Sequence, residues 1–276
     1  MLNFGDLLNL EGLEIRKVRL PRHQDNRHKS FRTSYAVWRD DRPAFEEYQR
    51  TQSFSDRSKL TGDIWASFVG LPNNETMFVG LYSSTFLGAT PSDRIHPITR
   101  SVIPAGSCNH YELGLLPQMS EMKGRLLVDW GPGFRAWVQR ADSKPKRVTE
   151  YRKQFMEPDF PGFSCFLSKL SDINSLPVSW LSALRSTRGI YVLTCPKTKE
   201  QYVGSASGAG GFLSRWYEYS VTGHGGNIAL KGREASDYQI GILQTVGSDA
   251  NEIEILTLET LWKKKLQSRE MGLNRN

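Results

Sequence analysis

Residues 188–204 read RGIYVLTCPKTKEQYVG, and this stretch decides the fold of the C-terminal third of the chain. Its first part, Gly189 to Thr194, is an apolar run rich in β-branched and aromatic residues, which is typical of a strand. Residues 195–199 contain Pro196 and supply turn chemistry, and a second short strand follows over residues 201–204. The spacing therefore predicts a β-hairpin that carries one tyrosine in each arm, Tyr191 and Tyr202.

Two helices and a third strand are expected after this hairpin. A glycine-rich bend over residues 207–211 leads into a helical pattern from Phe212 to Tyr219. Arg215 and Tyr219 are four residues apart, so they share one face of that helix. Residues 237–244 have the composition of a third strand. A capping-box-like start at residues 249–252 predicts a last helix, on which Glu259 lies in an otherwise apolar stripe.

The order of these residues resembles the GIY-YIG nuclease family. The resemblance rests on Gly189-Ile190-Tyr191, on Tyr202-Val203-Gly204 after a spacer of ten residues, and on four later positions in the family's order, namely Arg215, Tyr219, Glu259 and Asn274. It covers about a third of the chain. It implies a three-stranded antiparallel sheet flanked by helices, and a metal-dependent endonuclease that hydrolyses DNA phosphodiester bonds.

The residue types fit that chemistry. An arginine can clamp a phosphate with two hydrogen bonds, and a metal held by a carboxylate can act as a Lewis acid. Glu259 is the candidate metal ligand, because a lone carboxylate on a stripe with Ile255, Trp262 and Leu266 is costly to bury without a partner. One carboxylate with several waters suits Mg²⁺, or Mn²⁺, better than zinc. The alternative is a glutamate at the edge of the stripe that reaches water.

The tyrosines raise a separate question, because a free phenol has a pKa of about 10 and is a poor base at neutral pH. The resemblance implies that Tyr191 acts as the general base or orients the attacking water, and that Tyr202 and Tyr219 hold the phosphate. A nearby cation such as Lys197 or Lys199 would depress the pKa of a phenol. The alternatives are turn lysines that are only solvated, and tyrosines that only pack in the core.

Three further features of the C-terminal part remain open. His224 lies in a glycine-rich loop and could contact a phosphate or protonate a leaving oxygen, or it could be an exposed loop histidine. Asn274 corresponds to the family's asparagine that assists the site, although a position near a chain end is prone to fraying. The run Lys263-Lys264-Lys265 would suit contact with a nucleic-acid backbone, or it could be a solvated face.

Composition limits the class of protein. The chain has 276 residues and a formal net charge of +7, with a sequence pI of about 9.3, which suits a polyanionic partner. Its three cysteines have no C-x-x-C spacing, which argues against a zinc site and a disulfide framework and for a reducing compartment. The N-terminus lacks the pattern of a signal peptide, and no apolar run is long enough to span a bilayer. We therefore expect a cytoplasmic protein with DNA as partner and no membrane association.

Residues 1–150 are expected to form a separate β-rich domain. Residues 64–70 and 76–82 flank a Pro-Asn-Asn turn and have a β-hairpin pattern with many aromatic residues. Short strands separated by Gly and Pro suggest a small barrel or a curled sheet, and the pattern loosely resembles PUA-like barrels, a group that includes readers of modified bases. Such a reader holds a flipped base between aromatic faces. The candidates are Trp38, Trp65, Phe68 and Trp137, although core packing is the commoner fate of each.

Two segments of this region have a less defined prediction. Residues 22–29 are polar and basic, and they form either a solvated loop or a phosphate-contacting loop. A single helix is expected from Asp40 to Ser53, with Pro43 in its first turn. Residues 151–185 contain several prolines and are expected to link the first domain to a nuclease domain at residues 186–276.

The sequence thus predicts a two-domain α+β protein with a C-terminal nuclease and an N-terminal recognition module. Restriction-type cleavage is the role we expect, and whether a base modification is required stays open. A single catalytic centre implies a homodimer or sequential nicks. The alternatives are a nuclease of branched DNA or of RNA, a nucleic-acid-binding module that no longer cuts, and a protein-interaction domain.

Overall fold

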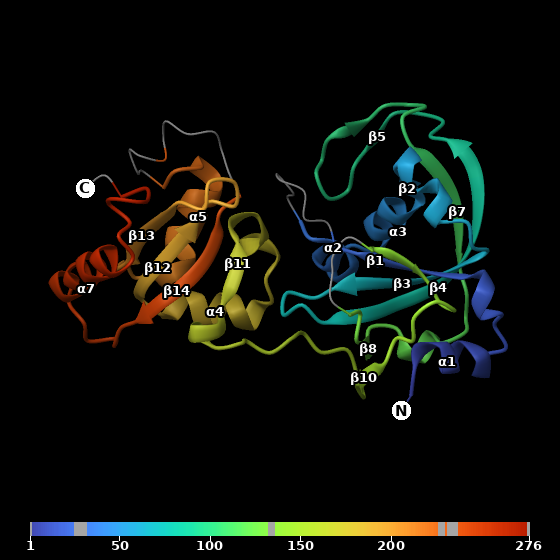
Figure 1. Ribbon diagram of the computed structural model, residues 1–276, viewed down its shortest axis with the longest axis horizontal. Coiled ribbons are helices and arrows are strands. Elements are labelled where there is room, and N and C mark those ends of the chain that lie inside the picture. The colour runs from blue at the N-terminus through green and yellow to red at the C-terminus, as the bar shows by residue number, and fades with distance from the viewer. Residues whose placement is uncertain (1, 25–31, 132–135, 226–229, 231–236, 275–276) are drawn as a thin grey trace. The chain divides into compact units, whose positions relative to one another are not determined.

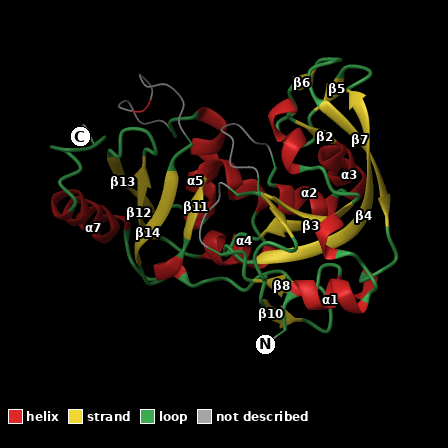
Figure 2. Ribbon diagram, turned by 45° about the vertical axis from the view of Figure 1, so that its right-hand side comes forward, coloured by secondary structure: helices red, strands yellow, loops and turns green. Residues whose placement is uncertain are grey.

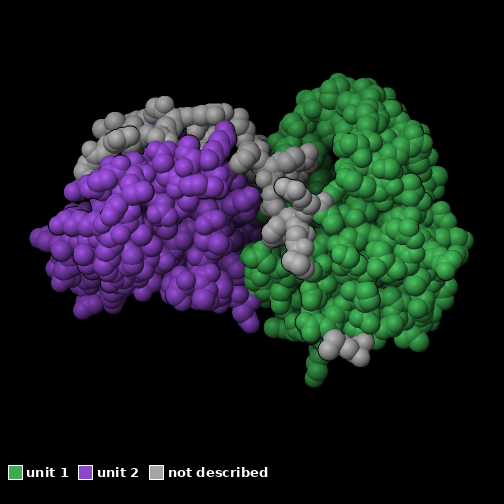
Figure 3. Space-filling view, in the orientation of Figure 1, with its two compact units in different colours: residues 1–26, 30–158 green, residues 27–29, 159–276 purple. Residues whose placement is uncertain are grey.

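The computed structural model describes residues 2–24, 32–131, 136–225, 230 and 237–274. These residues fall into two compact units, unit 1 before residue 159 and unit 2 from residue 159 on. Figure 1 labels their elements and Figure 3 colours the units separately. None of the helices within the described ranges is long and apolar enough to cross a bilayer.

Unit 2 is built on a four-stranded antiparallel sheet with the order β11-β14-β12-β13. The strands are β11 (Leu167–Lys169), β12 (Gly189–Thr194), β13 (Gln201–Ala206) and β14 (Gln239–Thr245). The predicted hairpin forms β12 and β13, and the predicted third strand forms β14. The sheet has one strand more than expected, because β11, from the segment predicted to be a linker, pairs with β14 through Leu167↔Gly241.

Helices cover both faces of this sheet (Figures 1 and 2). One face packs against α4 (Val178–Ser186) and α5 (Gly211–Thr222), in a core that includes Tyr191, Trp180 and Trp216. The other face packs against α7 (Glu252–Lys265). Because successive strand residues point to opposite faces, β12 presents Tyr191 to α5 and Ile190 to α7.

The ends of α5 and α7 follow from local chemistry. Gly223 ends α5 in a left-handed conformation with φ 75°, which glycine adopts without steric cost. A capping box begins α7, in which the Asn251 side chain accepts from the Glu254 backbone N–H at 3.0 Å and Glu254 accepts from the Asn251 N–H at 3.0 Å. The helix therefore begins at Glu252, three residues later than the expected start at 249.

Unit 1 is a curled sheet whose main path is β10-β8-β4-β3-β1-β9, with β7 paired to β4 and to β2. A β-bulge between Phe86 and Gly88, in the pairing of β4 with β7, bends the longest strand, β4, so the sheet curls rather than staying flat. The strands are β1 (Val18–His23), β2 (Thr51–Gln52), β3 (Ile64–Gly70), β4 (Thr76–Ala89), β7 (Asn109–Leu115), β8 (Leu126–Val128), β9 (Val138–Arg140) and β10 (Val148–Tyr151), with a separate pair β5 (Arg94–Ile95) and β6 (Val102–Ile103).

Three helices accompany this sheet, namely α1 (Phe4–Leu10), α2 (Ser34–Asp40) and α3 (Arg42–Arg50). The helix expected from Asp40 to Ser53 is α3, which is shorter: it begins after Asp41, whose side chain accepts from the Ala44 backbone N–H at 3.2 Å as its cap, and it ends at Arg50, where β2 follows. The preceding helix α2 was not expected. Short 3₁₀ turns are η1 (Ile15–Lys17), η2 (Phe54–Lys59), η3 (Ser120–Met122), η4 (Phe163–Cys165) and η5 (Leu170–Ser175).

The candidate base-reading aromatics of unit 1 are mostly core residues. Trp38, Trp65 and Phe68 are 0–1% exposed, so their rings are not available to a base, and only Trp137 is partly exposed. The basic segment from residue 22 also differs from the loop that we expected. Arg22 and His23 belong to β1 and are buried, while residues 25–29 lie outside the described part of the chain.

Candidate active site

Two glycines fix the hairpin of unit 2. A Cβ atom added to Gly189 would lie 2.1 Å from the backbone oxygen of Gln244 on β14, so only glycine lets β12 approach β14 this closely. A Cβ atom added to Gly204 would lie 2.5 Å from the Tyr191 hydroxyl oxygen and 2.9 Å from the ring of Tyr202. The phenol of Tyr191 therefore lies directly over the backbone of β13.

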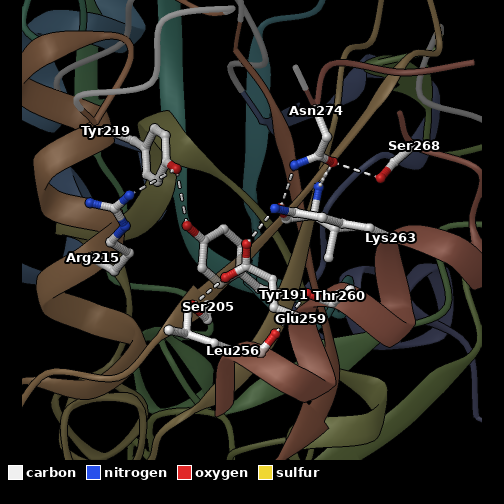
Figure 4. Close-up of polar contacts among 11 residues, drawn as sticks. Tyr191, Ser205, Arg215, Tyr219, Leu256, Glu259, Thr260, Lys263, Ser268 and Asn274 are labelled. Atoms are coloured by element: carbon white, nitrogen blue, oxygen red, sulfur yellow. Dashed lines mark hydrogen bonds and ion pairs between the residues drawn. The ribbon is translucent and has the colours of Figure 1, made fainter. Parts of the chain in front are cut away.

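Tyrosine and arginine side chains meet above this hairpin on the α5 side (Figure 4). Tyr191 donates a hydrogen bond to the hydroxyl oxygen of Tyr219 at 3.1 Å, and Arg215 Nη2 donates to the same oxygen at 3.5 Å. The ring of Tyr202 packs edge-on against Tyr219, with centroids 6.2 Å apart. We call these four residues, Tyr191, Tyr202, Arg215 and Tyr219, the phenol cluster.

Burial dominates the electrostatics of the phenol cluster. Tyr191 is 0% exposed and Tyr219 is 1% exposed. Burial raises the pKa of Tyr191 well above 10, Tyr202 adds to the increase, and the cation of Arg215 offsets only part of it. Burial likewise raises the pKa of Tyr219, with further increases from Tyr191 and Tyr202. The raised pKa disfavours the phenolate, so in this conformation Tyr191 is a neutral hydrogen-bond donor to Tyr219. The role of Tyr191 as general base stays a prediction.

The turn lysines do not change this conclusion. Lys199 is exposed, and its Nζ donates to the Pro196 carbonyl oxygen at 2.8 Å within the hairpin turn. Lys197 is also exposed. The largest influences on the pKa of Tyr191 are burial, Tyr202, Arg215 and Tyr219.

Arg215 is the partly exposed cation of the phenol cluster. Its side chain is 32% exposed, and Nη1 forms an ion pair with Glu218 Oε2 at 2.6 Å. Burial lowers the pKa of Arg215, but Tyr191, Tyr219 and Glu218 together raise it by more, so the guanidinium stays fully charged. A phosphate that binds Arg215 therefore has to compete with the Glu218 carboxylate.

Glu259 lies on α7 in a second group of side chains. One of its carboxylate oxygens accepts a short hydrogen bond from the Ser205 hydroxyl. The other oxygen forms an ion pair with Lys263 Nζ at 2.7 Å, and the two side chains are only 12% and 6% exposed. We call these three residues, Glu259, Ser205 and Lys263, the carboxylate cluster.

Adjacent residues of β13 connect the two clusters. Tyr191 lies over Gly204, and Ser205, the next residue, binds Glu259. Side-chain alternation places Gly204 on the α5 face and Ser205 on the α7 face, and β13 is an edge strand of the sheet. The predicted residues are thus brought to the same place along β13, but the carboxylate and the phenols approach it from opposite faces.

The carboxylate cluster contains hard oxygen donors of the type that Mg²⁺ takes, namely a carboxylate and a hydroxyl. The described residues contain no group of three or more His, Cys, Asp or Glu side chains that could hold a metal ion, so a metal at Glu259 would be bound mainly by water and substrate. A divalent ion and an ammonium 4 Å apart repel by about 8 kcal/mol at an effective dielectric constant of about 20. The donors therefore fit a divalent cation once the Lys263 ammonium has moved away.

Asn274 holds the free edge of β13. Its side chain accepts from the Val203 backbone N–H at 2.9 Å, donates to the Val203 carbonyl at 2.9 Å, and accepts from the Ser268 hydroxyl at 2.6 Å. Asn274 is 1% exposed, so it is not a frayed end. The structure gives it a positioning role, because Val203 immediately precedes Gly204 and Ser205.

His224 follows the glycine that ends α5. Its backbone N–H donates to Thr222 Oγ1 at 3.3 Å, and the residue is partly exposed. The predicted role of its imidazole on a phosphate or a leaving oxygen stays a prediction.

Sequence reasoning missed three polar partners at this site, Ser205, Glu218 and the buried Lys263. A signal existed for each of them. Glu218 and Lys263 are three and four residues after Arg215 and Glu259, which is the spacing of side-chain pairs on a helix. Ser205 directly follows the second glycine of the hairpin motif, on the strand face opposite Tyr202.

No family model matches the chain, and no curated protein matches it. Among solved structures, the chain is similar to the catalytic domain of the intron endonuclease I-TevI, in an alanine-mutant form. The two share 24% sequence identity over 33% of this chain and 94% of that domain, with a TM-score of 0.27. This likeness is weak and partial, so the argument about the site depends on the geometry described above.

Proposed function

We propose that the chain is an endonuclease that hydrolyses phosphodiester bonds of DNA at the edge of β13. The observation that carries the proposal is that Gly204 and Ser205 hold the phenol cluster and Glu259 at consecutive residues. A guanidinium for the phosphate, a phenol for the attacking water and a carboxylate for a cation are the groups that this reaction needs.

Each residue of the phenol cluster receives a role from its chemistry. Arg215 binds a non-bridging phosphate oxygen of the substrate after its ion pair with Glu218 has broken. Tyr202 and Tyr219 position the phosphate, and Tyr191 orients the attacking water as a neutral phenol, since its raised pKa disfavours the phenolate. Tyr191 has no exposed surface, so DNA binding has to uncover it before water can reach its hydroxyl.

Glu259 and Ser205 would hold Mg²⁺ or Mn²⁺, which when bound supplies a Lewis acid for the phosphoryl oxygens. Lys263 has to leave Glu259 for this to happen. The role of Asn274 is to keep β13 in register, so that Gly204 and Ser205 present the two clusters to the same phosphate.

We further propose a restriction-type role in which unit 1 recognises DNA. Unit 1 contains a cleft of about 600 Å³ that is lined by Arg22, Trp130, Asn73 and Asp129, among others. A cleft of this volume can hold a planar base, and the Arg22 guanidinium lies 5.9 Å from the centroid of the Trp130 ring. Reading of a modified base is therefore part of the proposal, and the net charge of +7 supports DNA as the partner.

The test is digestion of matched plasmids, unmodified or carrying methylated or hydroxymethylated cytosine, with Mg²⁺ or with a chelator, followed by sequencing of the ends. We expect cleavage that depends on Mg²⁺, and we expect the sequenced fragment ends to lie at a recurrent sequence. Cleavage of one modified plasmid only would identify the modification. A double-strand cut that requires two protein copies would support a homodimer, whereas successive nicks would show that the two strands are cut one at a time.

Two observations favour a second candidate, a nucleic-acid-binding protein that does not cut. Both oxygens of Glu259 are already engaged, and Tyr191 is fully buried. In that case the chain would bind plasmid DNA, with an affinity that falls as the salt concentration rises. It would leave every plasmid uncut in the presence of Mg²⁺ or Mn²⁺.

A further inference from the structure

Lys263 differs from its two neighbours in the run of lysines at the end of α7. Lys264 and Lys265 are exposed, and Lys265 Nζ lies 4.6 Å from the centroid of the Trp262 ring. Lys263 is buried, with its side chain 6% exposed and its ammonium 2.7 Å from Glu259 Oε1. Only the first residue of the run is therefore withheld from solvent and from contact with a nucleic-acid backbone.

We propose that the Lys263 ammonium is the resident counter-ion of Glu259, and that a divalent cation binds Glu259 only by displacing it. This inference rests on the proposed function in one respect, the assignment of Glu259 as the metal ligand. Lys263 then sets the metal affinity of the site, because every binding event includes the loss of the ion pair.

The geometry supports exchange rather than coexistence. The ammonium contacts one oxygen of the carboxylate, and Ser205 donates to the other, so both oxygens that could face a metal ion are engaged. Like charges at contact distance in a partly desolvated site repel strongly. Since the four-carbon side chain of lysine is flexible, the ammonium can swing away from Glu259 while α7 stays in place.

The resident ammonium also explains why the site is stable without metal. A carboxylate that is 12% exposed is costly to bury unless it is paired and hydrogen-bonded. Glu259 precedes Lys263 by four residues, which is the favourable order for an ion pair on a helix. The pair therefore holds the carboxylate oriented towards Ser205 in the metal-free protein.

A purely structural ion pair would have a different consequence. It would stabilise the helix, but divalent cations would have no effect on a variant that lacks the lysine. Exchange predicts instead that removing the ammonium destabilises the metal-free protein and that a divalent cation restores the loss.

The test compares wild type, Lys263→Met, Lys263→Gln and the matched control Lys264→Met, which removes the same charge from an exposed position one residue away. Mn²⁺ binding is measured on the full chain from the loss of the free Mn²⁺ electron paramagnetic resonance signal. Thermal unfolding is measured with and without Mg²⁺. Glu259→Gln shows whether any binding depends on the carboxylate.

We expect Lys263→Met to bind Mn²⁺ about tenfold or more tightly than wild type, because one like charge has been removed from direct contact with the ligand. Its unfolding temperature should be lower than that of wild type without metal and should rise with Mg²⁺. Lys264→Met should match wild type in both measurements, and Glu259→Gln should show no specific binding.

Equal Mn²⁺ affinity in Lys263→Met and Lys264→Met, or an unfolding temperature of Lys263→Met that Mg²⁺ does not raise, would overturn the proposal. If Lys263→Met does not fold, Lys263→Gln decides the question by the same two measurements, since its amide is neutral and can still donate to Glu259. Failure of the proposed function would look different. In that case Mn²⁺ would bind more tightly to the Lys263 variants as expected, but no plasmid would be cut.

Discussion

Replacing Gly204 with alanine should destabilise unit 2 by about 1–3 kcal/mol, the usual cost of forcing an extra methyl group into a packed core. The new Cβ would lie 2.5 Å from the Tyr191 hydroxyl oxygen, 2.7 Å from Cζ of the same ring and 2.9 Å from Cε1 of Tyr202. Carbon atoms pack at about 3.5–4.0 Å, so the Tyr191 ring would have to move by about 1 Å. The ring is fully buried, and Trp216 and Tyr219 pack against it with centroids 6.0 and 6.2 Å away.

Urea unfolding measures this cost directly. With an m value of about 2 kcal/mol/M, the midpoint of unit 2 should fall by roughly 0.5–1.5 M. Gly208→Ala is the matched control, because the structure leaves open space around a Cβ at that position, and it should be neutral or slightly stabilising. Alanine is favoured over glycine within a strand by roughly 0.5–1 kcal/mol, so a loss of stability in Gly204→Ala isolates the steric effect. An unchanged midpoint would refute the packing of Tyr191 over β13.

Three further changes test other interactions within unit 2, two at the site and one at Asp172 in η5. Asn274→Ala removes three buried hydrogen bonds and leaves the side-chain partners of the Val203 backbone missing. It should lower the free energy of unfolding in urea by about 2–4 kcal/mol. A loss below about 0.5 kcal/mol would contradict the proposed role of Asn274 in holding β13. Burial, with a contribution from Asp237, raises the pKa of Asp172 from 3.8 to about 6, so the folded protein holds this proton more tightly than the unfolded chain, and stability falls as the pH rises from about 4 to 6. Asp172→Asn should therefore stabilise the protein by about 1–3 kcal/mol at pH 7.5 and by little at pH 4, and an equal effect at both pH values would disprove the shift. Tyr219→Phe deprives the buried Tyr191 hydroxyl of its acceptor and should cost about 1–3 kcal/mol, whereas Tyr191→Phe in that background should recover part of the loss, and simple additivity of the two variants would count against the hydrogen bond.

The hairpin and its helices could be predicted because their signals are local. Alternation, turn residues and helical spacing lie within a few residues of each other, and β12, β13, β14 and α5 begin within two residues of the expected positions. The strand β11 could not be predicted in this way. Its three residues are too short to show periodicity, and its partner β14 lies about 70 residues later in the chain.

The same distinction between local signals and long-range packing applies to the site. The positions of Tyr191, Arg215 and Glu259 follow from motif order, but the face of the sheet from which each side chain approaches β13 depends on packing. The burial of Lys263 shows this most clearly. A run of three lysines has the composition of a solvated surface, yet Lys263 is four residues after Glu259 on the stripe that faces the sheet, and only the docked helix shows that its ammonium is buried.

Unit 1 was predictable at the level of class but not of topology. Alternating patterns predict β3 and the first half of β4, whereas the parallel pairing of β1 with β3, Val18↔Ile64, joins strands about 45 residues apart. The aromatic residues illustrate the same limit. Trp65 and Trp137 look alike in sequence, but only the curl of the sheet decides that Trp65 is buried and Trp137 partly exposed.

The central claim is that the phenol cluster and Glu259 act on one phosphodiester bond from opposite faces of β13. It is tested most directly by nicking of supercoiled plasmid in Mg²⁺ with wild type, Arg215→Ala and Glu259→Gln, each first shown to be folded by its unfolding transition. The account predicts that wild type nicks the plasmid and that each substitution alone abolishes nicking while plasmid binding persists. Nicking by Glu259→Gln at the wild-type rate would show that the two clusters do not form one active site.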